Sequence, residues 1–143
     1  MPRIVHDSVE EVAVRQRRSI DISGQSHGTN PIPAACIKNG FLASGAIYGL
    51  AGGAPAPLDL HGQIEAMFAN MAAILAAAGG SLDDIVHVSI KLADPGDRSA
   101  LNRHWLNAFP DPASRPARHV DGEPLKMSPR LIAAEILAVL DPA

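Results

Sequence analysis

The segment spanning residues 130–140, RLIAAEILAVL, is apolar at almost every position. Successive side chains of a β-strand point to opposite faces, so a strand formed here is apolar on both. It must be covered on both faces, and helices of the same chain can cover only one of them. Glu135 stands in the middle of this segment, although a glutamate is seldom buried without a partner.

The remaining pattern predicts an α+β fold. Period-two alternation or a hairpin signal at Lys38-Asn39-Gly40 predicts strands within 18–23, 34–48, 84–93, 115–120 and 130–140. One helix is predicted over 60–78 after an Asp59 cap and before Gly79, and a second from Asp94 to Pro110. Grouped strands with two helices indicate a two-layer sandwich, in which both helices cover one face of a mixed sheet.

The strand at 84–93 is predicted to be half buried. Its alternation places Val86, Val88, Ile90 and Leu92 on one face and His87, Ser89 and Lys91 on the other. His87 is therefore interpreted as a solvated or interface residue.

A chain of 143 residues and 15.0 kDa has room for one domain. We interpret residues 1–30 as an N-terminal arm with the first strand, where Ser8 and Glu11 form a possible capping box, and 31–143 as the main body. Only 3% of residues are aromatic, so bulky core anchors are few. Association between copies would supply the missing burial.

Composition also excludes several classes of function. With a net charge of −3 and a pI near 6.0, the chain lacks the excess of basic residues expected of a nucleic-acid-binding protein. Cys36 is the single cysteine, which excludes an internal disulfide and a cysteine-based metal cluster. No secretory signal or membrane span is evident, so we expect a cytoplasmic protein with no membrane partner. The six histidines lack metal-ligand spacing, and we expect no metal site.

Residues 24–28, GQSHG, match the G-x-S-x-G pattern of a serine nucleophile. That motif requires a helix directly after the serine, and the prolines at 31 and 33 oppose one. A plain loop is the favoured interpretation.

The segment PARHV offers a counter-ion for Glu135. Arginine binds carboxylates through a planar, two-pronged set of donors, and Arg118 lies in a short apolar strand that we expect near the last one. Two readings stay open at this point, a structural ion pair or a functional site. His119 should point to the opposite face from Arg118 and is a weaker candidate for a functional role.

Several segments together resemble the RidA/YjgF family of enamine and imine deaminases. They are SGAIYG, AAILAAAGGSLDDIVHVSIKLAD, LNRHW, PARHV and AAEILAV, and they extend over roughly residues 31–140 in the family's order. The resemblance implies the small α+β sandwich also found in chorismate mutase, a ferredoxin-like arrangement. It further implies a homotrimer with active sites in the clefts between subunits.

The resemblance also implies roles for individual residues. Arg118 matches the arginine that grips the substrate carboxylate, and Glu135 the glutamate that positions or activates water. The residues that match pocket-lining or substrate-binding positions are Ser44, Gly45, Asn102 and the backbone N–H of Val120. Two positions depart from the family pattern, because Ile32 stands where an aromatic lid is frequent and Ala46 where glutamine is common.

The function implied is hydrolysis of a small enamine or imine that carries a carboxylate, giving a 2-keto acid and ammonia without a cofactor. One alternative is a ligand-binding or regulatory trimer without useful turnover, suggested by Ile32. The ribonuclease or translation-inhibitor activity attributed to some relatives is disfavoured by the acidic charge balance.

Overall fold

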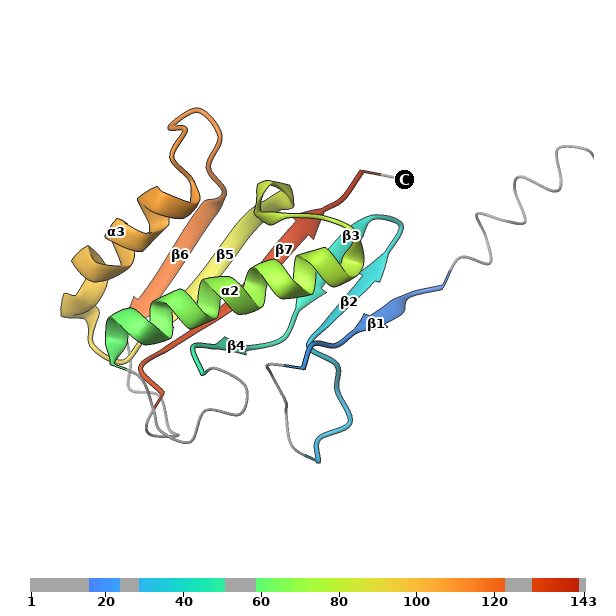
Figure 1. Ribbon diagram of the computed structural model, residues 1–143, viewed down its shortest axis with the longest axis horizontal. Coiled ribbons are helices and arrows are strands. Elements are labelled where there is room, and N and C mark those ends of the chain that lie inside the picture. The colour runs from blue at the N-terminus through green and yellow to red at the C-terminus, as the bar shows by residue number, and fades with distance from the viewer. Residues whose placement is uncertain (1–15, 24–28, 51–58, 123–129, 142–143) are drawn as a thin grey trace, which may run out of the picture.

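The computed structural model describes residues 16–23, 29–50, 59–122 and 130–141 (Figure 1). Its elements are β1 (Arg18–Ile20), β2 (Ala35–Lys38), β3 (Phe41–Ser44), β4 (Ile47–Tyr48), α2 (Leu60–Ala78), η1 (Leu82–Asp84), β5 (Ile85–Leu92), η2 (Pro95–Asp97), α3 (Arg98–Ala108), β6 (Ala117–Gly122) and β7 (Ile132–Val139). The possible capping box at Ser8 and the motif at 24–28 lie outside the described residues.

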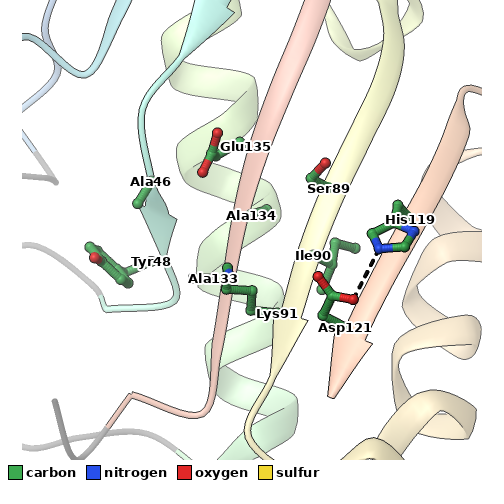
Figure 2. Close-up of a pocket in the computed structure, with 10 residues that line it drawn as sticks. All are labelled: Ala46, Tyr48, Ser89, Ile90, Lys91, His119, Asp121, Ala133, Ala134 and Glu135. Carbon is green, nitrogen blue, oxygen red and sulfur yellow. Dashed lines mark hydrogen bonds and ion pairs between the residues drawn. The ribbon is translucent and has the colours of Figure 1, made fainter. Parts of the chain in front are cut away.

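The strands form one mixed sheet in the order β1-β2-β3-β7-β5-β6, with β4 pairing to β7 beyond the end of β3. All neighbours are antiparallel except β5 and β6, which are parallel and connected through α3. Both helices pack on the same face of the sheet, and in Figure 2 they lie behind it. The predicted α+β class, with two helices on one face of a mixed sheet, is confirmed.

The predicted hairpin lies between β2 and β3. Asn39 and Gly40 have φ angles of 53° and 81°, as a two-residue type I′ turn requires. The stretch after it is not one strand, because β3 ends at Ser44 and β4 begins at Ile47.

The helix α2 has the predicted ends. The Asp59 side chain accepts a hydrogen bond from the Gly62 N–H at 2.8 Å, and Gly79 closes the helix in the left-handed conformation at φ 94°. Its apolar stripe is fully buried against the sheet and consists of Ile64, Met67, Met71, Ile74 and Leu75. The second predicted helix is divided, since a 3₁₀ turn follows the Asp94 cap and α3 begins only at Arg98.

The alternation predicted for β5 is wrong at one position. Val88, Ile90 and Leu92 are buried as expected, but Val86 is 49% exposed. The pairing of β5 with β7 shifts register between Ile85 and His87, so Val86 is the extra residue of a bulge and turns away from the core.

Within the described ranges, no element covers the face of the sheet away from the helices. Three large apolar side chains lie exposed where β3 and β7 meet, namely Phe41, Leu137 and Val139 at 49%, 38% and 51%. We call this side of the sheet the open face. The helices cover only one face of β7, as the two-sided apolar pattern of this strand indicated.

Candidate functional site

Glu135 lies on the open face in a row with two other polar side chains. The register pairs Ser89 of β5 with Glu135 of β7 on one side and with His119 of β6 on the other. Directly paired residues of neighbouring strands point to the same face, so the three side chains share it. Figure 2 shows Glu135 and Ser89 side by side and His119 on the next strand.

A cavity of about 340 Å³ opens above this row. Ten residues line it (Figure 2): Ala46, Tyr48, Ser89, Ile90, Lys91, His119, Asp121, Ala133, Ala134 and Glu135. The volume is in the range of small-molecule sites, and the lining combines apolar walls with five charged or titratable groups. Arg130 stacks over the ring of Tyr48 at 3.7 Å and so fixes one wall.

The second polar feature of the cavity is a contact between His119 and Asp121. The two residues are two apart on β6, and His119 Nε2 lies 3.0 Å from Asp121 Oδ1 (Figure 2). The sequence could have indicated this pair, because the period of two in a strand places residues i and i+2 on one face.

Ser44 and Gly45 form an irregular segment beside Glu135. Ala43 pairs with Leu137 and Ile47 with Ala134, so β3 and β4 together hold one residue more than the part of β7 they face. The Ser44 hydroxyl bridges this bulge, accepting from the Ile136 N–H at 2.9 Å and donating to the Gly45 carbonyl at 2.8 Å. Its hydrogen-bonding capacity is therefore used by the backbone.

Arg118 lies at the outer edge of the sheet, on the helix side of β6. Its guanidinium carbon stands 4.9 Å from the ring centroid of Trp105 in α3. Nη1 is buried and has no hydrogen-bond partner within the part of the chain that the structure describes. Burial, and secondarily the positive charge of Arg98, lower the pKa of Arg118 from its usual value. A desolvated cation with an unsatisfied donor is a strong anion-binding group.

Val120 and Asn102 are the other predicted binding residues on β6 and α3. The Val120 carbonyl accepts a hydrogen bond from Arg98 Nη2 at 3.1 Å, at the edge that β5 does not cover. The N–H and C=O of a strand residue point the same way, so the Val120 N–H also faces outward. Asn102, which is exposed, lies one helical turn from both Arg98 and Trp105, on the side of α3 that contacts β6.

The predicted site residues thus fall into two groups that a single chain does not bring together. Val88 pairs with both Arg118 and Ile136, which places Arg118 on the helix face, whereas Glu135 lies on the open face two strands away. The expected Arg118–Glu135 ion pair is therefore wrong within one chain. Ile32 joins neither group, since it is 54% exposed in the loop before β2.

Sequence reasoning missed three contacts of these groups: Trp105 beneath Arg118, Arg98 on Val120, and Asp121 beside His119. Trp105 is only 8% exposed and, with Leu101, forms the buried side of α3. Among the described residues, no three His, Cys, Asp or Glu side chains gather as metal ligands would. No helix in the same ranges has the length and apolar character to cross a bilayer.

Comparison with known proteins gives consistent matches. The family model described as Endoribonuclease L-PSP matches residues 10–122. A mitochondrial protein of Schizosaccharomyces pombe named mmf1 is 33% identical over 88 residues, which are 62% of this chain and 53% of the relative. A RutC family protein of Pyrococcus horikoshii is 37% identical over 60 residues, or 42% of this chain and 46% of the relative. The matched stretch therefore spans about half the length of these curated relatives.

Solved structures agree on the fold. Yeast Mmf1 superposes with a TM-score of 0.79 at 22% identity, covering 88% of this chain and 100% of that one. RidA from an Antarctic Psychrobacter superposes with a TM-score of 0.77 at 22% identity, covering 86% of this chain and 99% of that one. At these identities the likeness concerns the architecture alone.

Proposed function

Because this chain belongs to the endoribonuclease L-PSP family, to which proteins of the RidA/YjgF type also belong, we propose that it is a hydrolytic deaminase. Its substrate class is a small enamine or imine that bears a carboxylate, and the products are a 2-keto acid and ammonia. The observation that carries this proposal is the buried Nη1 of Arg118, for which the described residues supply no hydrogen-bond partner.

Arg118 and its neighbours are suited to hold the carboxylate. An arginine can bind both carboxylate oxygens at once, and Trp105 fixes the plane of the guanidinium. The outward N–H of Val120 adds a backbone donor beside it, and Asn102 lies on the adjacent turn of α3. The positive charges of Arg98 and Arg118 repel each other. An anionic ligand would neutralise this repulsion and is therefore favoured.

Glu135 is suited to activate water. It lines a cavity that admits a small molecule, and the small side chain of Ala133, two residues before it on the same face, leaves space above the strand. Since Arg118 lies on the other face of its own sheet, the carboxylate anchor at each cavity would come from a neighbouring copy. A homotrimer with its sites between subunits meets this need and covers the exposed Phe41, Leu137 and Val139.

The reaction needs few groups. An enamine first takes a proton on carbon to become the imine. Held by its carboxylate, the imine presents its C=N carbon to a water above Glu135, which accepts a proton as the water attacks. The carbinolamine then loses ammonia as its hydroxyl becomes the keto oxygen.

The direct test uses an amino-acid oxidase to generate imines and follows keto acid formation with and without this protein. We expect faster hydrolysis with wild type, loss of this effect and of keto acid binding in Arg118→Ala, and loss of turnover with retained binding in Glu135→Gln. Hydrolysis no faster than the background, or keto acid binding that is unchanged in Arg118→Ala, would refute the proposal.

A ligand-binding trimer without turnover is the second candidate. The observation that favours it is the exposed aliphatic side chain of Ile32, at a position where relatives frequently carry an aromatic lid. It predicts keto acid binding that depends on Arg118 together with imine hydrolysis at the background rate, so the same assay separates the two functions.

A further inference from the structure

His119 and Asp121 lie in the same cavity as Glu135 and have no part in the function proposed above. Ser89 is paired with both Glu135 and His119, so the carboxylate and the imidazole flank a small side chain, with their Cα atoms two strand spacings, or about 10 Å, apart. A small planar substrate above Ser89 would have Glu135 at one end and His119 at the other (Figure 2).

The contact with Asp121 prepares His119 for proton transfer. Asp121 Oδ1 lies 3.0 Å from Nε2, and this contact orients the ring. Nδ1 has no partner within the described residues and is left for a ligand. Both side chains are largely exposed in the single chain, at 66% and 53%. Exposed pairs contribute little to stability, so this pair is poorly explained as a structural device.

The proposed hydrolysis requires an acid as well as a base. Ammonia leaves only if the departing nitrogen is protonated, while Glu135 must be ionised to take the proton of water. A protonated acid and a separate ionised base perform these two proton transfers more readily than one group that must change between the two states.

We propose that His119, oriented by Asp121, is the general acid that protonates the departing nitrogen; this inference rests on the proposed deaminase function. In the first step the water oxygen bonds to the C=N carbon, Glu135 takes a water proton, and His119 gives a proton to nitrogen. The proton on Glu135 then returns to His119 through solvent.

In the second step His119 gives the amine a further proton, and the C–N bond breaks with its electron pair leaving on ammonia. Glu135 accepts the hydroxyl proton as the keto group forms. The sum is imine plus water to keto acid plus ammonia. Among the described residues, the charged groups on the open face around His119 are Asp121 on its own strand, Lys91 on β5 and Glu135 on β7. His87 of β5 lies on the same face, two residues before Ser89.

The test is the pH dependence of kcat for imine hydrolysis in wild type, His119→Gln, Asp121→Asn and the matched control His87→Gln. His87 is a half-buried histidine of β5 that does not line the cavity. We expect a bell-shaped profile for wild type and for His87→Gln. His119→Gln should lose about 100-fold in kcat, at the low end of general acid–base effects, together with the alkaline limb.

Asp121→Asn should lower kcat, because the ring of His119 loses the carboxylate contact that orients it. Binding of pyruvate, measured by calorimetry, should be unchanged in His119→Gln. A His119→Gln variant with the kcat and alkaline limb of wild type would overturn the role of His119 alone. Wild-type protein that does not accelerate hydrolysis would refute the deaminase function, and this role with it.

Discussion

Ser44→Ala tests whether the bulge beside Glu135 is held by a side chain. The Ser44 hydroxyl bridges the Ile136 N–H and the Gly45 carbonyl, at 2.9 and 2.8 Å, at the point where β3 stops pairing with β7. Ile136 is 1% exposed, so water does not readily replace the lost acceptor.

The expected cost follows from that burial. A buried N–H left without its acceptor costs about 1–3 kcal/mol. For a domain of this size the loss corresponds to a fall in Tm of about 3–10 °C. It is a substantial fraction of a total stability of about 5–15 kcal/mol.

The assay is urea denaturation followed by circular dichroism, with all variants at one protein concentration, because the proposed association would make stability depend on concentration. Ser89→Ala is the matched control, since Ser89 lies on the open face one strand away and bridges no bulge. It should change stability by less than about 0.5 kcal/mol. If Ser44→Ala were as stable as Ser89→Ala, the assigned role of the hydroxyl would be wrong.

Three further substitutions test the packing around Gly49, the support of Arg118 by Trp105, and association through the open face. Gly49→Ala should lower the free energy of unfolding, measured by urea denaturation, by about 3 kcal/mol or more, because the added Cβ would collide with the Gln63 backbone carbonyl. A urea midpoint equal to that of wild type would contradict the close approach of Gly49 to Gln63. Trp105→Leu should raise the KM for a carboxylate-bearing imine about two- to fivefold with little change in kcat, because the aromatic ring beneath the Arg118 guanidinium is lost. An unchanged KM would show that Trp105 does not support Arg118 in binding. Val139→Asp, which places a charge on the open face, should lower the mass found by light scattering toward 15 kDa; an unchanged mass would show that this patch is not an interface.

The strands and helices could largely be predicted from the sequence, because each carries a local signal. Asp59 and Gly79 mark the ends of α2, and Asn39-Gly40 marks the β2–β3 hairpin. The position of Val86 could not be predicted, since a bulge arises from the pairing of β5 with β7 and leaves the local alternation unchanged.

The candidate site could be predicted only as a set of residues. β7 is apolar on both faces, so its pattern does not show which face carries Glu135. The face of Arg118 depends on the parallel register between β5 and β6, which are separated by α3 in the sequence. These two registers place Arg118 and Glu135 on opposite faces of the sheet, so the expected ion pair does not form within one chain.

The central claim is that a working site combines Arg118 of one copy with Glu135 of another. Arg118→Ala and Glu135→Gln, carrying different affinity tags, can be co-expressed and the mixed oligomers purified through both tags. Each variant alone should hydrolyse imines at the background rate. In a cyclic trimer that carries both tags, one of the three interfaces joins an intact Arg118 to an intact Glu135, so activity should return to about a third of wild type. Mixed oligomers no more active than either parent would contradict a shared site.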